Sequence, residues 1–211
     1  MRVKNLAAVI ALLFGGIATS AIAGPAIYNT GVDDSGHLLV GGAADSHYTF
    51  LEGTTSTSAV VLSDSNLWYQ WDKPSDARWL YNADQFDSGY RGWATFTTTV
   101  DLTGHDPETA KLMGQWAADQ YGYITLNGTN TGNSVSDGNW NGNLTAFSIQ
   151  SGFEKGLNTL AFHVYLPDGG DGLVVSKATL SAALVPEPET YAMFITGLGL
   201  VGFMARRRKP A

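Results

Sequence analysis

Aromatic and acidic side chains crowd residues 66–93 of this chain. Flat indole and phenol rings stack on the apolar faces of sugars, and neighbouring polar groups orient the sugar hydroxyls. Trp68, Trp71, Tyr81 and Asp84 combine these features and are our candidate ligand-binding residues. The same rings would equally suit the packed interior of a domain, so two interpretations of this segment stay open.

No group of side chains in the sequence has the spacing of a catalytic motif. The chain has no cysteine, which excludes disulfides, thiolate nucleophiles and cysteine-ligated zinc. A Gly-x-Ser-x-Gly nucleophile elbow and a phosphate-binding glycine loop are also absent. The four histidines lack metal-ligand spacing, and the alternation around His163 predicts that it lies on the outer face of a strand. We therefore predict that the protein is not an enzyme.

Four aspartates lie in glycine-rich stretches whose composition favours turns. Ca²⁺ prefers several oxygen ligands from flexible loops, but the chain has no EF-hand spacing. Aspartates that close turns explain the same residues. We expect no cofactor, and a structural calcium ion is the alternative. The four residues are Asp33, Asp34, Asp168 and Asp171.

The elements that must position these residues are β-strands. Apolar and polar residues alternate along 93–102 and 159–166, which is the period of a half-buried strand. Turn sequences such as Asn127-Gly128 separate the candidate strands. Residues 106–110 suit a single helical turn. Many short strands with frequent turns predict an all-β protein with one jelly-roll β-sandwich over residues 24–184. The other predicted strands are 37–40, 48–51, 59–62, 112–117, 121–126, 146–150 and 173–184.

The charge of the chain argues against nucleic acid as a partner. The formal net charge is −7, and Arg2, Lys4 and residues 206–209 supply half of the 12 lysines and arginines. The body between these ends is therefore more acidic than the total indicates. An acidic surface repels both nucleic acid and anionic lipid.

Residues 1–23 have the three parts of a secretory signal peptide. Arg2 and Lys4 form a basic start, and an apolar core follows. Ala21 and Ala23 form the small-x-small pattern that signal peptidase accepts, which predicts cleavage before Gly24.

Residues 185–211 have the order of a second targeting segment. Val185, Pro186, Glu187 and Pro188 precede an apolar stretch that predicts a transmembrane helix at residues 190–205. The prolines should hold their own segment extended, because proline disfavours helix. A basic stop cluster ends the chain and would remain on the cytoplasmic side of the inner membrane. Its members are Arg206, Arg207, Arg208 and Lys209.

This C-terminal segment resembles the PEP-CTERM sorting signal of Gram-negative bacteria, with its motif, glycine-bearing helix and basic block in the same order. The resemblance implies that the chain is a substrate of an exosortase, a membrane-embedded protease that would cut near Pro-Glu-Pro. It also implies export across the inner membrane and a membrane-anchored precursor. The mature protein would then reach the cell surface or the medium.

The second half of the body resembles the galactose-binding-like jelly-roll domain. The resemblance rests on residues 96–102, 110–112, 115–120, 124–128 and 156–164, while 129–143 is an Asn- and Gly-rich stretch. Members of that family bind sugars, bind proteins or only pack against a neighbour. The sequence thus favours a non-catalytic surface or extracellular-matrix protein associated with exopolysaccharide or biofilm. The alternatives are a carbohydrate-binding module, a protein-interaction module and, last, a glycan hydrolase.

Overall fold

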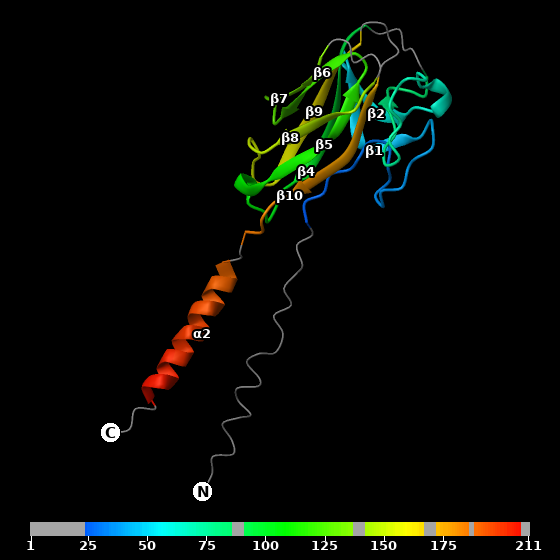
Figure 1. Ribbon diagram of the computed structural model, residues 1–211. Coiled ribbons are helices and arrows are strands. Elements are labelled where there is room, and N and C mark those ends of the chain that lie inside the picture. Colours follow the sequence, from blue (N-terminus) through cyan, green and yellow to red (C-terminus); the bar gives the residue numbers. More distant parts are fainter. Residues whose placement is uncertain (1–23, 86–90, 137–141, 167–171, 186–187, 208–211) are drawn as a thin grey trace.

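The computed structural model describes residues 24–85, 91–136, 142–166, 172–185 and 188–207. Within these residues, the chain forms an antiparallel β body and a C-terminal helix, α2 (Pro188–Arg207) (Figure 1). Two 3₁₀ turns, η1 (Asp64–Asn66) and η2 (Pro107–Thr109), interrupt the body. The strands are β1 (Ala44–Glu52), β2 (Thr55–Val61), β3 (Leu80–Tyr81), β4 (Gly92–Asp101), β5 (Lys111–Ala118), β6 (Tyr121–Leu126), β7 (Thr129–Val135), β8 (Thr145–Ile149), β9 (Leu157–Leu166) and β10 (Leu173–Ser181).

The strands form one sheet that folds back on itself into two layers. Their order is β7-β6-β9-β4-β1-β2-β3-β10-β5-β8. Trp116 of β5 and Phe147 of β8 lie with ring centroids 5.6 and 6.1 Å from that of Phe162 on β9, so the two halves of the sheet face one another. The predicted all-β class is confirmed, and the architecture is a β-sandwich close to a jelly roll.

A side chain joins the two terminal strands of this sheet. The Asn133 amide of β7 donates to the Ser148 carbonyl oxygen of β8 at 3.1 Å and accepts from the Ser148 N–H at 3.2 Å. Both backbone groups of Ser148 are therefore bonded at the point where the sandwich nearly closes.

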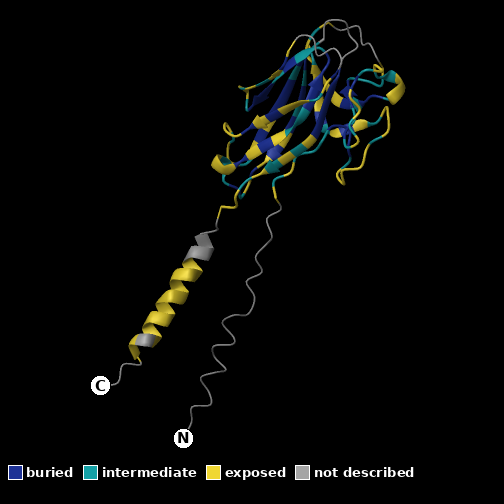
Figure 2. Ribbon diagram, in the orientation of Figure 1, coloured by how far each residue is buried: buried dark blue, intermediate teal, exposed yellow. Residues whose placement is uncertain are grey.

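The alternation predicted for the central strands is confirmed. Along β4, Phe96 and Val100 are buried in the core, whereas Trp93, Thr95 and Thr97 point to the other face. The same holds for β9, in which Leu160, Phe162 and Val164 are buried. Figure 2 shows this buried interior of the body. Burial of one face fixes the strand register, because a slip by one residue would turn every core side chain outward.

Three segments differ from the sequence-based predictions. Residues 37–40 form no strand and contribute only a bridge between Leu38 and Val32. Strands β3 and β7 were not predicted. Strand β7 has one buried residue, Val135, so its sequence shows no apolar alternation. It is a strand because its backbone pairs with β6. The predicted helical turn at 106–110 is confirmed as η2, whose N–H at Glu108 is capped by Asp106.

Helix α2 coincides with the predicted C-terminal helix, but two details differ. Among the described residues, no helix combines the length and apolar character needed to cross a membrane, so the transmembrane assignment of 190–205 is not borne out. The helix also begins at Pro188, where an extended chain was predicted. Proline fits the first turn of a helix because its missing N–H has no partner there. The predicted signal peptide, residues 1–23, lies outside the described residues.

Candidate functional site

Aromatic rings gather on the outer face of β4, β9 and β6, where Trp93 is exposed and the tyrosines are half-buried. Strand register places Trp93 opposite Tyr165, and Tyr165 opposite Tyr121, so three rings form a row across three strands. The Trp93 ring centroid lies 5.3, 5.4 and 5.8 Å from those of Tyr165, Tyr123 and Tyr121, each in an edge arrangement. Trp93 nevertheless keeps 44% of its surface exposed. We call Trp93, Tyr121, Tyr123, His163 and Tyr165 the aromatic face.

His163 occupies the second row of the aromatic face, as its predicted outer position requires. Its Nδ1 lies 3.0 Å from the Thr95 hydroxyl and its Nε2 lies 3.1 Å from the Thr125 hydroxyl. The ring also stacks on Tyr123 with centroids 4.6 Å apart. Burial lowers the pKa of His163 below its ordinary value, which favours the neutral ring. Since both nitrogens have hydroxyl partners, this histidine is fixed in place and holds Tyr123 with it.

An open depression of about 550 Å³ lies beside the aromatic face. Its lining combines ring surfaces with hydroxyl and amide groups, which can both donate and accept hydrogen bonds. The lining residues are Tyr123, Thr125, Gly128, Asn130, Thr159, Ala161 and His163.

Charge is absent from the rows that continue this face. Strand pairing sets Thr97 beside Ala161 and Ala161 beside Thr125, and the next row pairs Thr99 with Thr159. The outward positions of the three strands from these rows up to the Trp93 row carry only aromatic, hydroxyl, alanine and imidazole side chains. The chain has a net charge of −7, yet the described side chains of these rows are uncharged. They can offer ring stacking and hydrogen bonds.

Of the two tryptophans proposed from the sequence, the structure buries one. Trp68 is exposed and remains a candidate, whereas Trp71 is only 3% exposed. The Trp71 ring stacks on Trp79 with centroids 4.1 Å apart, and a side-chain carbon at Gly142 would lie 2.9 Å from both rings. The structure therefore places Trp71 in the interior, as the alternative interpretation of this segment had it, and the indole pair forms the surface against which Gly142 packs.

Tyr81 and Asp84 also have internal roles. Tyr81 is fully buried and meets Phe50 edge to face at 5.6 Å. Asp84 accepts hydrogen bonds from the Ser63 hydroxyl, the Ser63 N–H and the Asn66 amide. The bonds from Ser63 hold the pKa of Asp84 below its ordinary value. In the structure, Tyr81 thus fills the core and Asp84 anchors the η1 turn.

The described residues contain no group of three or more acidic or histidine side chains that could hold a metal ion. Asp33 closes a turn by accepting from the N–H groups of Ser35 and His37, and Asp34 lies 3.3 Å from the His47 imidazole. Asp168 and Asp171 lie outside the described residues. The turn interpretation thus accounts for Asp33.

The body holds residues 183–185, at the start of the predicted sorting motif, by hydrogen bonds. Ala183 donates to the Thr109 hydroxyl at 2.8 Å, and its carbonyl oxygen accepts from the Asp106 N–H at 2.8 Å. The Val185 N–H donates to the Gly104 carbonyl oxygen at 2.9 Å, and Leu184 forms a β-bridge with His105. We call the loop at residues 103–109 the clamp.

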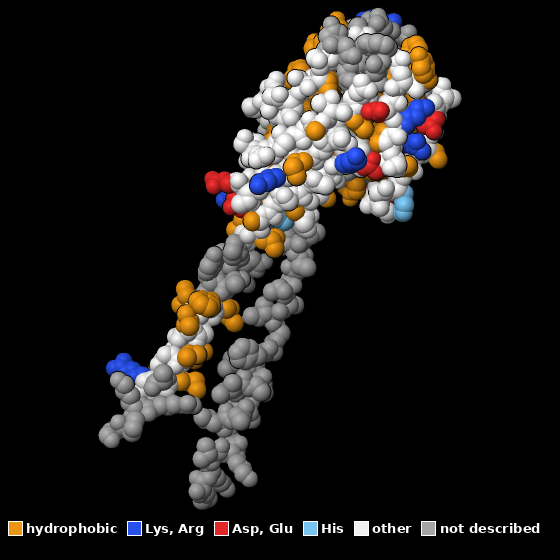
Figure 3. All heavy atoms as spheres, viewed as in Figure 1, with side chains coloured by type: hydrophobic (Ala, Val, Ile, Leu, Met, Phe, Trp, Pro, Cys, Tyr) orange, Lys and Arg blue, Asp and Glu red, His pale blue; other side chains and the backbone are white. Residues whose placement is uncertain are grey.

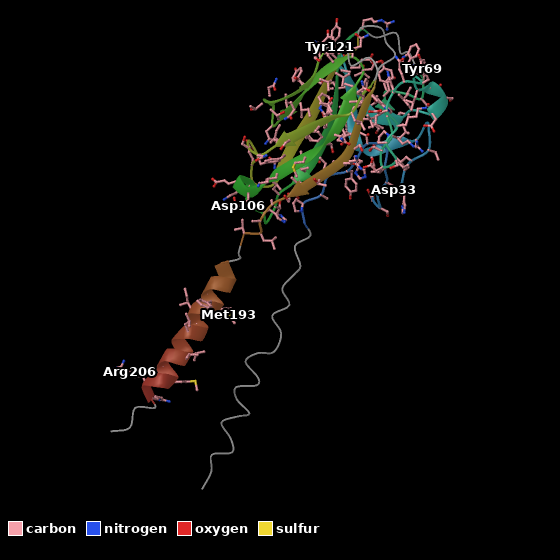
Figure 4. The ribbon with its side chains drawn as sticks, viewed as in Figure 1. Asp33, Tyr69, Asp106, Tyr121, Met193 and Arg206 are labelled. Atoms are coloured by element: carbon pink, nitrogen blue, oxygen red, sulfur yellow. The ribbon has the colours of Figure 1, made fainter. Side chains whose placement is uncertain are left out.

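The clamp and the aromatic face lie at different ends of the body. Asp106 of the clamp lies where the chain leaves for α2, and Tyr121 lies at the far end (Figure 4). Apolar side chains follow α2, and Lys/Arg atoms mark its end (Figure 3). Of the basic cluster, Arg206 and Arg207 are exposed. Gly24 is the first described residue and is exposed. Outside the described residues lie Ala21, Ala23, Pro186, Glu187, Arg208 and Lys209.

Several solved structures are similar to the body at low identity. A family 35 carbohydrate binding module from Clostridium thermocellum has a TM-score of 0.41 and 14% identity, over 75% of this chain and 98% of that one. The corresponding module from Paenibacillus barcinonensis has a TM-score of 0.38 and 15% identity, over 66% and 96%. The Stig cyclase Fisc from Fischerella sp. TAU has a TM-score of 0.38 and 9% identity, over 76% and 100%. Similarity at this level carries no ligand or activity over to this chain.

The C-terminal segment has a sequence match of its own. No curated protein matches the chain significantly in sequence. Residues 184–209, however, match the PEP-CTERM protein-sorting motif, and they begin at the leucine that the clamp holds. A motif of this kind implies export and processing by an exosortase. The chain therefore carries a PEP-CTERM protein-sorting motif directly after a folded β-sandwich.

Proposed function

We propose that this chain is an exported, exosortase-processed, non-catalytic surface protein whose β-sandwich binds extracellular polysaccharide through the aromatic face. The sorting motif supports export and exosortase processing, and the aromatic face supports a polysaccharide as the ligand. The precursor is held at the inner membrane through its C-terminal segment. After cleavage, the body joins the exopolysaccharide matrix, or biofilm, outside the cell.

The observation that carries the binding proposal is the row of the exposed Trp93 and the half-buried Tyr165 and Tyr121 on the outer face of the sheet. Soluble proteins normally bury large rings, and exposed clusters mark interaction sites. Sugar rings present C–H groups to flat aromatic surfaces, and their hydroxyls bond to neutral donors and acceptors. Both kinds of contact lie within two neighbouring strand rows here, because the Thr95–His163 row lies next to the Trp93–Tyr165 row.

The composition of the aromatic face favours binding over glycoside cleavage. A glycosidase needs two carboxyl groups flanking the scissile bond. Along the described rows of this face, the side chains include no carboxylate, and His163 is held by two threonine hydroxyls. We therefore propose that the ligand leaves the face unchanged.

Affinity electrophoresis of the full chain through gels containing neutral or anionic polysaccharides tests the binding proposal. Retardation by at least one neutral polysaccharide is expected. Free migration through every gel would refute it. Selective capture of an envelope protein in that case would favour the protein-interaction alternative.

The intact mass of the mature protein from the producing cell tests the address. Ends near Gly24 and Pro188 are the expected result. A mass that retains Arg206 and Arg207 would refute exosortase processing without bearing on the aromatic face.

A further inference from the structure

We infer that the clamp masks the sorting motif in the folded protein, so that residues 183–185 must detach from the body before the exosortase can process the chain. This inference rests on the proposed processing but not on polysaccharide binding. It concerns the backbone of the segment that the protease must approach.

The clamp occupies backbone groups directly beside the motif. Both the N–H and the carbonyl oxygen of Ala183 are bonded to the body, as is the N–H of Val185. The motif prolines follow Val185 without a spacer, and α2 begins at Pro188. Only residues 186–187 separate the last clamped residue from the helix.

A protease and the clamp would compete for the same groups. Extended peptides bind partners by adding a strand, and their backbone N–H and C=O groups make the contacts. In this protein Leu184 already pairs with His105 as an antiparallel bridge. A second strand cannot use the bonded groups of Ala183 and Val185 until the bridge opens.

The clamp depends on the folded body. The Leu102 N–H donates to the Gly156 carbonyl oxygen at 2.8 Å, and Leu102 is fully buried. Asp101 fixes the start of the loop by accepting from the Thr103 N–H at 2.8 Å. Masking therefore requires that the ends of β4 and β9 are paired, and it arises only on folding.

Opening the clamp need not unfold the body. Leu184 and Val185 are 56% and 46% exposed, so their detachment loses little apolar burial. Segments with few buried contacts and exposed hydrogen bonds open locally at low free energy. The clamp can thus set the rate of processing while the sandwich stays intact.

A reversible lock tests the inference. His105 and Leu184 are bridge partners, and paired residues of antiparallel strands lie close enough for a disulfide. The native chain has no cysteine, so two introduced cysteines can pair only with each other within one molecule. Purified His105→Cys/Leu184→Cys protein is incubated with membranes of the producing bacterium, with and without reductant, and processing is followed by mass. We expect no processing of the oxidised form and recovery after reduction.

Thr109→Val weakens the clamp without cysteines. It removes the hydroxyl that accepts from Ala183 and donates to the Asp106 carbonyl oxygen. We expect processing to become roughly two- to tenfold faster, the factor for the loss of one net hydrogen bond. Thr57→Val, an exposed threonine on β2, is the matched control and should process at the wild-type rate.

The outcomes separate the two proposals. An oxidised lock that is processed as fast as the Leu184→Cys single variant overturns the clamp, as does an unchanged or slower rate for Thr109→Val. If the wild-type chain is not processed by these membranes, exosortase processing fails and the clamp inference fails with it.

Discussion

Replacing Trp93 by alanine is the most direct perturbation of the aromatic face. The side chain meets three tyrosine rings at centroid distances of 5.3 to 5.8 Å and keeps 44% of its surface exposed. Aromatic pairs contribute about 0.5–1.5 kcal/mol each beyond buried area, but the exposed half of the indole lowers the total. We therefore expect Trp93→Ala to lower the free energy of unfolding by about 2 kcal/mol, or a melting temperature about 4–8 °C lower.

The effect on binding should be at least as large as the effect on the fold. A tryptophan at the centre of a binding face typically contributes about 2 kcal/mol or more, which corresponds to roughly a 30-fold rise in Kd. Trp93→Phe keeps a flat ring and should retain most of the affinity. Calorimetric titration with the polysaccharide that retards the wild type measures the Kd of both variants. The titration is run at a temperature at which thermal unfolding curves show each variant to be folded.

Tyr69→Ala is the matched control for Trp93→Ala. Tyr69 is 87% exposed and lies on the loop between η1 and β3, away from the aromatic face. Its removal should leave Kd within about twofold of the wild type, because Tyr69 lies in a turn and is not part of the aromatic face. The reasoning is refuted if folded Trp93→Ala binds as tightly as Tyr69→Ala.

The remaining predictions concern the fold around the site. Trp71→Ala should destabilise the protein by about 3–5 kcal/mol, because it empties one half of the stack on Trp79; a denaturant midpoint equal to the wild type would contradict this. Burial lowers the pKa of His163 from 6.5, so its contribution to stability is complete above that pH and is lost as pH falls through the folded-state pKa. Denaturant titrations from pH 7.5 to 5 should show this loss, and a His163→Gln variant with the same slope would exclude His163 as its source. Asp84→Ala should cost about 1–3 kcal/mol by freeing the Ser63 N–H and hydroxyl, and faster amide exchange at Ser63 checks it.

The strands could be predicted where the sequence carries its own period. Along β4 and β9, alternation assigned Phe96 and Phe162 to the core and His163 to the outer face, as observed. The aromatic face was missed because its rings come from three strands. Only the register between β4, β9 and β6 brings Trp93 to Tyr121, and no local pattern encodes that register.

The direction of the rings at residues 66–93 could not be predicted for a related reason. Trp68 and Trp71 lie in a segment without regular structure, so no period tells which ring turns inward. Trp71 is buried among tertiary contacts, with Trp79 and with Gly142 far away in the chain. By contrast, the sorting motif is linear, and its residues were recognised without any knowledge of the fold.

The Asn133 amide that joins β7 to β8 has a consequence for how copies of this protein coexist when crowded at one surface. A terminal strand with free N–H and C=O groups is a template on which another chain can polymerise. Asn133 already bonds both backbone groups of Ser148, so a neighbouring copy cannot add a strand at that point. The Asn133 side chain thus protects the edge of β8 against edge-to-edge aggregation at this position. The chain has no cysteine, so no disulfide joins β7 to β8.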